Sequence, residues 1–316
     1  MSVMKKLSLV VPCYNEEESI PLFYRTVSKV IDSMNTPTPT VTPEYIFVDD
    51  GSSDHTLEEM KQLHQDHPET VHFRSFSRNF GKESALAAGL QATTGDMVAV
   101  MDVDLQDPPE LLPEMVDLIE NRDYDCVGTI QQERRGQSRL RAFLSRSFYS
   151  VINWISDVRI EPNARDYRLM TRQFVDTVLS LPEFNRFSKG IFSWVGFKTT
   201  YLTYESQPRA AGTTHWSLRQ LFAYSIEGII DFSNAPLRLA TWVGSLSFLA
   251  SIVALIFVIV RALTVGGSVA GWPSLVVIFL AIGGIQLFCL GILGQYISKI
   301  YLETKHRPKY IIREEK

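Results

Sequence analysis

The sequence predicts an α/β protein with a mostly parallel sheet, followed by amphipathic helices and a hairpin of two transmembrane helices. Three observations carry this prediction. Short apolar runs alternate with helical patterns through the first half of the 316-residue chain, polar clusters follow several of those runs, and two long uncharged runs lie near the end. Strands that alternate with helices favour right-handed crossovers and therefore parallel pairing.

Five short runs rich in apolar residues are predicted as strands, because each is too short for a typical helix, and the unbroken run Met97–Met101 is expected to be buried on both faces. They are Leu7–Val11, Tyr45–Val48, Val71–Phe76, Met97–Met101 and Cys126–Thr129. Three helical patterns separate the first four strands. The first begins near Ser19, the second follows Asp54, which is a favourable N-cap residue, and the third is rich in alanine and ends near Thr93.

Composition and motifs exclude several classes of function. Lys and Arg total 31 against 35 Asp and Glu, so the chain lacks the basic excess of a nucleic-acid-binding protein. No Gly-x-Gly-x-x-Gly follows the first strand and no P-loop is present, which argues against those nucleotide sites. Cys13, Cys126 and Cys289 match no metal or redox spacing, so we expect buried thiols in a reducing compartment. The N-terminus does not have the pattern of a signal peptide.

Polar clusters follow three of the predicted strands: Tyr14-Asn15-Glu16, Asp49-Asp50, and Asp102-Val103-Asp104. The carboxyl ends of parallel strands meet at one edge of a sheet, where open α/β sheets bind ligands. Tyr14 could stack on a base there, and Glu16 and Asp50 could accept hydrogen bonds from a base or ribose. Each cluster alone is typical of an ordinary turn, but three at one edge favour a ligand-binding crevice.

The cluster after the fourth strand suits a divalent metal ion. Asp102 and Asp104 are two positions apart, so strand alternation predicts that their side chains point the same way. With Gln106 they form an oxygen-rich group of the kind that binds a hard cation together with phosphates. A solvated acidic turn is the simpler alternative for so short a motif.

Four segments together resemble the family 2 glycosyltransferases of GT-A fold: Val10–Glu17, Val48–Asp54, Asn79–Lys82 and Asp102–Glu110. Within that family the chain is most similar to polyprenyl-phosphate glycosyltransferases, namely the bactoprenol glucosyltransferases and dolichyl-phosphate mannose synthases. The resemblance covers nearly the whole chain. It implies a nucleotide-sugar donor, Mg²⁺ or Mn²⁺ as cofactor, and a lipid-phosphate acceptor.

The resemblance also implies roles for individual residues. Those expected to bind the nucleotide sugar are Pro12, Tyr14, Asn15, Glu16, Asp50, Lys82 and Asp102. The expected metal ligands are Asp102, Asp104 and Gln106. The expected catalytic residues are Asp104, Asp166 and Arg209. Those expected at the acceptor phosphate are Arg134, Arg141, Ser145, Arg168 and His215. A structural ion pair is an equally common reading of Asp166, and His215 stands where the family usually has a lysine.

Two amphipathic stretches separate the strand region from the long apolar runs. The first follows Arg134 and carries apolar residues on one side and arginines on the other, and the second runs from Leu218 to Ile230. Either an ordinary amphipathic helix or a helix lying on the membrane surface fits the first pattern. The resemblance favours the membrane surface, where arginines would meet anionic head groups or the lipid phosphate.

The two uncharged runs, Leu239–Val260 and Trp272–Ser298, are each long enough to span about 30 Å of hydrocarbon. Arg238 precedes the first run and a basic tail follows the second, so the positive-inside rule predicts that both termini are cytoplasmic. Glycine and serine on the faces of both runs favour close packing in a hairpin and contacts between subunits of a homo-oligomer.

We therefore expect a catalytic domain over residues 1–216, a juxtamembrane helix over 217–236, two transmembrane helices over 237–298 and a cytoplasmic basic tail over 299–316. The catalytic domain would face the cytoplasm at the inner, or plasma, membrane. The expected reaction is inverting transfer of one hexose, from UDP-glucose or UDP-GlcNAc, to undecaprenyl or another polyprenyl phosphate. The product would serve cell-envelope glycan modification, together with a flippase and a downstream glycosyltransferase.

Two other functions stay open on the sequence. A processive polysaccharide synthase would share the catalytic domain, but it would carry a Gln-x-x-Arg-Trp motif and more transmembrane segments, and neither is found here. A catalytically inactive scaffold of a membrane glycan complex is the other alternative. The presence of Asp102, Asp104 and Gln106 argues against it.

Overall fold

The computed structural model describes residues 4–36, 41–132, 153, 161–205, 233, 235–264 and 271–316. Five predicted site residues lie outside these ranges: Arg134, Arg141, Ser145, Arg209 and His215. Most of the predicted juxtamembrane helix, 217–236, lies outside them as well.

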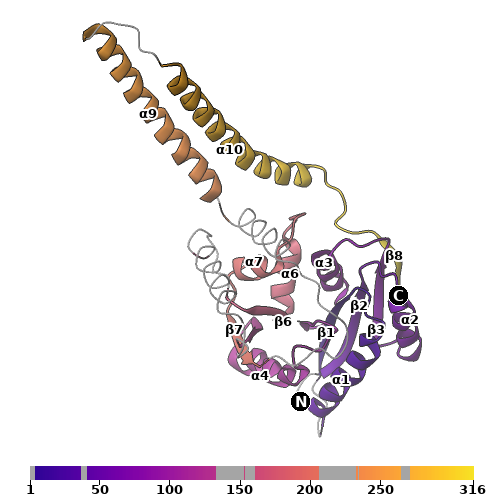
Figure 1. Ribbon diagram of the computed structural model, residues 1–316. Coiled ribbons are helices and arrows are strands. Elements are labelled where there is room, and N and C mark those ends of the chain that lie inside the picture. The colour runs from indigo at the N-terminus through magenta and orange to yellow at the C-terminus, as the bar shows by residue number, and fades with distance from the viewer. Residues whose placement is uncertain are drawn as a thin grey trace.

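The described residues form one sheet, several covering helices and a long helical hairpin (Figure 1). The strands are β1 (Lys5–Cys13), β2 (Val41–Asp49), β3 (Val71–Phe76), β4 (Met97–Val100), β5 (Cys126–Gln131), β6 (Ala164–Thr171), β7 (Thr199–Tyr204) and β8 (Ile312–Glu315). The helices are α1 (Ser19–Met34), α2 (Thr56–Asp66), α3 (Lys82–Ala92), η1 (Pro109–Leu111), α4 (Leu112–Arg122), α6 (Arg172–Ser180), α7 (Ser188–Trp194), α9 (Ala235–Thr264) and α10 (Trp272–Thr304).

The strand order across the sheet is β7-β5-β6-β4-β1-β2-β3-β8. β1, β2, β3 and β4 are parallel to one another, as the alternation of strands and helices predicts. β6 runs antiparallel between β4 and β5, so the strand at Cys126–Gln131 does not pair with β4. The α/β fold with a mostly parallel sheet is confirmed, and its antiparallel members are β6 and β8.

Helices cover both faces of the sheet. On one face, α1, α2 and α4 pack apolar residues against alternate residues of the central strands. Examples of these helical residues are Phe23 and Met115. On the other face, α3, α6 and α7 cover the remaining alternate residues, including Val10 and Val98. α3 lies very close to β1: a Cβ atom on Gly89 would come within 2.3 Å of the Val10 side chain. The central strands are therefore buried on both sides, which explains their unbroken apolar sequences.

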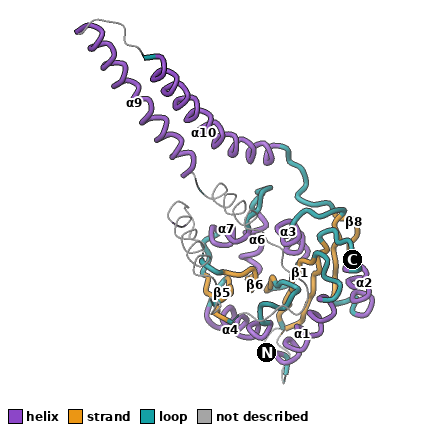
Figure 2. The backbone as a smooth tube through the Cα atoms, viewed as in Figure 1, coloured by secondary structure: helices purple, strands orange, loops and turns teal. Residues whose placement is uncertain are grey.

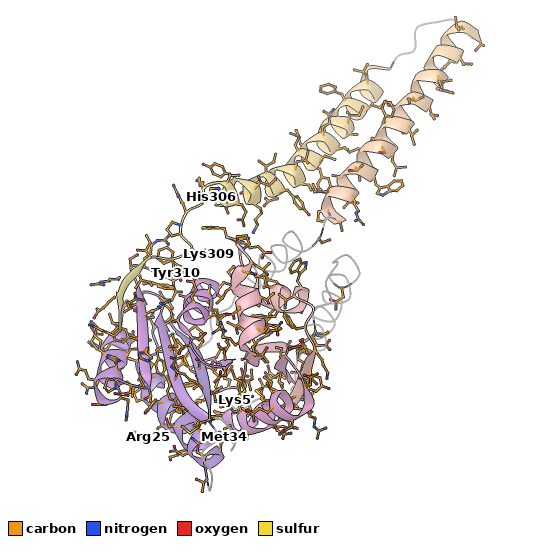
Figure 3. All side chains as sticks on the ribbon, turned by 180° about the vertical axis from the view of Figure 1, so that it is seen from behind. Lys5, Arg25, Met34, His306, Lys309 and Tyr310 are labelled. Atoms are coloured by element: carbon orange, nitrogen blue, oxygen red, sulfur yellow. The ribbon has the colours of Figure 1, made fainter. Side chains whose placement is uncertain are left out.

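The helical hairpin of α9 and α10 extends away from the sheet (Figure 2). Each helix contains a segment that is long and apolar enough to cross a membrane, Ala235–Ala254 and Ala281–Thr304, and neither segment is buried within the described part of the chain. Large apolar side chains such as Trp242, Phe257 and Phe279 are exposed along the hairpin, and Figure 3 shows side chains projecting outward from both helices. A soluble protein would rarely expose so much apolar surface.

The chain returns from the hairpin to the sheet. α10 continues to Thr304, and residues 312–315 then pair as β8 with the edge strand β3. The connecting segment, where His306, Lys309 and Tyr310 are labelled in Figure 3, packs against the domain through stacking of Tyr310 on Phe76. Residues 299–316 were predicted as a cytoplasmic tail. In this range the structure shows the end of α10, a connector and strand β8, and the cytoplasmic location stays a prediction.

Candidate active site

Three loops meet at the carboxyl ends of the parallel strands. β1 and β2 end level with each other, because Cys13 pairs with Asp49, and Pro12 lies one position earlier, opposite Val48. β4 ends at Val100, which pairs with Val10, so the strand is shorter than predicted. Asp102 and Asp104 consequently lie in a turn beyond the strand. Strand alternation therefore does not apply to these two residues, and the common direction of their side chains stays a prediction.

The loops after β1 and β2 are joined by hydrogen bonds from backbone to side chain. Asn15 adopts a left-handed conformation, with φ of 54°, and its Oδ1 accepts from the Ser53 amide at 2.9 Å. The amide of Glu16 donates to Oγ1 of Thr56 at 2.8 Å, and its carboxylate accepts from Ser19 at 2.7 Å. These bonds hold both loops firmly. Tyr14 stays 49% exposed beside them, which suits stacking on a planar ligand.

Asp50 connects the second loop to the start of α3. Its carboxylate accepts hydrogen bonds from the amides of Phe80, at 2.7 Å, and Gly81, at 2.9 Å. Gly51 follows with φ of +69°, and a Cβ there would lie 2.4 Å from the Arg78 carbonyl carbon, so only glycine fits. Asp50 therefore positions the loop that carries Lys82. Burial raises its pKa, although the two amides oppose the shift.

Lys82 joins two carboxylates from separate elements. Its Nζ lies 2.6 Å from Oδ1 of Asp102, in the turn after β4, and 2.5 Å from Oδ2 of Asp166, on β6. Burial would lower the Lys82 pKa, but the two carboxylates outweigh it and raise that pKa. Burial would likewise raise the Asp166 pKa, but Lys82 and Lys189 hold it well below its usual range. The Asp166 carboxylate is thus ionised and Lys82 is charged near neutral pH.

The turn after β4 presents oxygen ligands for a divalent cation. Asp104 is nearly buried, and its Oδ1 accepts from the Gln106 amide at 3.2 Å. Leu105 between them has φ of 54°, a conformation that costs of order 1–3 kcal/mol in a residue other than glycine. Such strain is found where a fold holds side chains in a required arrangement. Two carboxylates and an amide are a donor set that fits Mg²⁺ or Mn²⁺. No group of three or more His, Cys, Asp or Glu side chains is found in the described residues that could hold a metal by itself.

The profile of glycosyl transferase family 2 matches residues 8–179, which include the three loops and Asp166. The chain belongs to this family. The match covers more than half of the 316 residues and confirms both the GT-A fold and glycosyl transfer as the activity.

Relatives of this glycosyltransferase match it over almost its full length. The bactoprenol glucosyl transferase of Shigella phage SfV is 43% identical, over 98% of this chain and 99% of the relative. The putative glycosyltransferase CsbB of Bacillus subtilis is 41% identical, over 98% of this chain and 91% of the relative. A solved mannosyltransferase from Pyrobaculum calidifontis, in complex with GDP-Man and Mn²⁺, is similar with a TM-score of 0.45 and 15% identity, over 95% of this chain and 86% of that one. That structural likeness is too distant to assign a ligand here.

Two groups of residues at the site of this glycosyltransferase were not predicted. Asp107 accepts hydrogen bonds from Nε of Arg165, at 3.2 Å, and from the Tyr204 hydroxyl. Glu83, next to Lys82, accepts from the amide of Ser188 at 3.0 Å. Asp107 belongs to the same motif as Asp104, but no local pattern in the sequence indicates that residues of β6 and β7 would reach it.

Lys189 is a further cation near Asp166. Its Nζ donates to the carbonyl of Ala164 at 2.9 Å, on the strand that carries Asp166. Burial lowers the Lys189 pKa, and the Asp166 carboxylate opposes that shift. The bond to Ala164 and the charge of Asp166 explain how an ammonium group is tolerated there.

Arg168 lies beneath the surface of the glycosyltransferase. It is buried, its guanidinium donates to the carbonyls of Arg165 and Asp166 at 3.0 and 3.3 Å, and it lies 4.0 Å above the ring of Phe192. The guanidinium therefore braces the backbone of β6 at Arg165 and Asp166. Its predicted role at the acceptor phosphate stays a prediction.

Proposed function

We propose that the protein transfers a single hexose from a nucleotide sugar to a polyprenyl phosphate at the cytoplasmic face of the membrane. The observation that carries the proposal is the near-full-length identity of 43% to a bactoprenol glucosyl transferase, which spans the catalytic domain and the apolar hairpin alike. The open cluster of Lys82, Asp102 and Asp166 at the carboxyl edge of the sheet supports a site for phosphorylated ligands.

Asp102, Asp104 and Gln106 would hold Mg²⁺ or Mn²⁺. The ion would neutralise negative charge on the departing nucleoside diphosphate. Asp104 has the lowest exposure of the three and is fixed by the turn at Leu105, so we assign it the largest share of the binding.

The donor would lie across the loops after β1 and β2. Tyr14 would stack on the base, which we propose to be uracil, with UDP-glucose or UDP-GlcNAc as the donor. Asn15, Glu16 and Asp50 would support the pocket mainly through the loop contacts described above, and Pro12 through the end of β1. Lys82 would place its ammonium group near the diphosphate.

The acceptor phosphate needs no general base, because its oxygens are already anionic near neutral pH. A phosphate oxygen would attack the anomeric carbon as the bond from that carbon to the diphosphate oxygen breaks. The bonding electron pair would leave with the nucleoside diphosphate. A single displacement inverts the anomeric configuration, so an α-linked donor would yield a β-linked lipid phosphosugar. The protein would supply positioning and charge stabilisation.

Asp166 would orient Lys82 through their ion pair, and the acceptor phosphate would meet basic residues. Arg134, Arg141, Ser145, Arg209 and His215 are the proposed contacts. They lie outside the described residues, so substitution is the direct test of each. We expect Arg141→Ala to weaken use of the lipid more than use of the sugar donor.

Both termini and the catalytic domain are proposed to lie in the cytoplasm, with α9 and α10 spanning the inner membrane. The pairing of β8 with β3 supports this topology, because two helices separate strands of one sheet and an even number of crossings returns the chain to the same side. A cysteine-accessibility scan in intact cells should label residues 266–271 from outside. Labelling near Lys309 from outside would contradict the topology.

The product would be a lipid-linked sugar for modification of the cell envelope. A flippase and a downstream glycosyltransferase would then be required, because the sugar is made on the cytoplasmic side and used on the other. Small residues along both helices, including Gly244 and Gly284, lie in open surroundings that would accommodate close contacts in a homo-oligomer.

The test offers membranes that contain the protein a panel of labelled UDP- and GDP-sugars with undecaprenyl phosphate. We expect label from one UDP-hexose in the organic phase, and loss of transfer in EDTA. Label in a long polymer would instead identify a processive synthase. No transfer with any sugar would indicate an inactive scaffold.

A further inference from the structure

Asp107 closes the turn that carries the proposed metal ligands. Its carboxylate is 4% exposed and accepts from Arg165, on β6, and from the hydroxyl of Tyr204, at the end of β7. The other carboxylate oxygen, Oδ2, is buried and makes no hydrogen bond in the described part of the protein. Asp107 therefore links three elements that are far apart in the sequence.

The turn after β4 is held by contacts from both faces of the sheet. Arg165 and Asp166 are neighbours on β6, so their side chains point to opposite faces. Tyr167 and Leu169, on the Arg165 side, belong to the apolar core under α1 and α4, whereas Met170, on the Asp166 side, packs under α3 and α6. Asp166 reaches the start of the turn through Lys82 and Asp102, and Arg165 reaches its end at Asp107.

These two connections differ in stiffness. Lys82 is a flexible side chain with 44% of its surface exposed, so its contact with Asp102 is adjustable. Asp107 is bound by a planar guanidinium and a rigid phenol, and its buried carboxylate cannot lose these partners without leaving its charge unpaired. The end of the turn at Asp107 is thus the fixed one, and Asp104 lies three residues from it.

We infer that Asp107, through Arg165 and Tyr204, is a positioning residue that holds the turn of Asp102 and Asp104 in the conformation that binds metal and nucleotide diphosphate. This inference rests on the proposed function, since it concerns the donor side of that reaction. In this role Asp107 would contact neither substrate. It acts by restricting the turn, which includes the left-handed residue Leu105.

The experiment compares Asp107→Asn and Tyr204→Phe with wild type, using the full-length protein in detergent micelles. Asp176→Asn is the control, because it removes an arginine–carboxylate contact of 2.8 Å on the exposed surface of α6. Free Mn²⁺ is followed by its EPR signal during titration in the presence of UDP. The KM for sugar donor, the KM for polyprenyl phosphate and the melting temperature are measured on the same samples.

We expect Mn²⁺ with UDP to bind about tenfold more weakly in Asp107→Asn, as is usual when a group that orients metal ligands is lost. Tyr204→Phe should shift binding in the same direction by a smaller factor. The donor KM should rise in parallel, while the lipid KM changes less than about twofold, because only the donor side is disturbed. Asp176→Asn should match wild type.

If Asp107→Asn does not fold, Tyr204→Phe tests the positioning role of Asp107 instead. Wild-type binding of Mn²⁺ and UDP by the folded variants would overturn the inference and leave the proposed function intact, and so would an equal rise of the donor and lipid KM. A wild-type protein that binds no Mn²⁺ with UDP and uses no UDP-sugar would overturn both.

Discussion

The sheet carries a carboxylate–lysine cluster at each end, and the two are built differently. At the amino end, Glu44 is 3% exposed and accepts from Lys6 at 2.6 Å, from Ser8, and from the amide and hydroxyl of Thr94 at 2.9 and 2.7 Å. At the carboxyl end, Lys82 is shared between Asp102 and Asp166, whose side chains are 22% and 20% exposed.

The two clusters differ in whether their carboxylates have room for a ligand. Both oxygens of Glu44 are occupied by donors from its own fold, so the cluster has no capacity left for a ligand. The carboxylates around Lys82 remain accessible to solvent, and a lysine can exchange one partner for another. We therefore expect similar residue types to stabilise the protein at one end of the sheet and to serve ligand binding at the other.

The largest expected effect is on activity, from Asp104→Asn at the open end. Loss of one anionic ligand should lower the transfer rate by about 100-fold or more, because charge on the leaving diphosphate is no longer neutralised. The melting temperature in detergent should change little, since Asn keeps the shape and the acceptor oxygen. Transfer at the wild-type rate, or wild-type transfer in EDTA, would contradict the assignment of Asp104.

The next effect is on stability, from Glu44→Gln at the closed end. Hydrogen bonds to a buried charge contribute about 1.5–3 kcal/mol, so the melting temperature should fall by roughly 5 °C. The KM and kcat should stay close to wild type because Glu44 lies at the opposite end of the sheet. A specific loss of activity with an unchanged melting temperature would remove the distinction between the two clusters.

Acid should affect the same cluster. Burial acts to raise the Glu44 pKa, but the bonds from Lys6, Ser8 and Thr94 outweigh it and lower the pKa from 4.5 to about 2. A carboxylate with a depressed pKa contributes stability above its unfolded pKa and loses it as the pH falls through the folded value. Stability should therefore drop between about pH 4.5 and 2 by at most about 3 kcal/mol from this group. Thermal unfolding as a function of pH should show a shallower slope in Glu44→Gln, and an identical slope would refute the assignment.

The smallest effect is expected at the surface of β8. Glu314 pairs with Lys61 at 2.7 Å, with both side chains more than one-third exposed. Exposed pairs of this kind contribute about 0–1 kcal/mol, so Glu314→Gln should leave the melting temperature almost unchanged. A fall as large as that of Glu44→Gln would mean that exposure does not separate weak from strong clusters in this protein.

The sequence predicted the parts of the fold that are determined by local sequence patterns. The buried strands of the first half follow from short apolar runs, and the loops that end them follow from Asn15, Asp50 and Asp102 at fixed places in family motifs. β8 was missed because Ile312–Glu315 has one apolar residue followed by three charged ones and looks like a solvated tail. Only its pairing with β3, more than 200 residues earlier, makes it a strand.

The sequence predicted the residues of the site more fully than the contacts between them. Asp102, Lys82 and Asp166 are brought together as one cluster, although their ion pairs depend on β6 lying beside β4. The contact between Asp107 and Arg165 joins residues 58 positions apart, and no periodicity in the sequence indicates such a pair. The orientation of Asp104 could not be derived either, because it depends on a left-handed Leu105 beyond the end of the strand.

The cluster around Lys82 is proposed to serve transfer of one hexose to a polyprenyl phosphate with inversion. The most direct measurement combines mass spectrometry and NMR of the lipid formed by purified protein from UDP-glucose and undecaprenyl phosphate with Mn²⁺. We expect a lipid with one added hexose in β linkage, and no such lipid when Asp104→Asn is used. An α-linked sugar phosphate, or a chain of several hexoses, would contradict it.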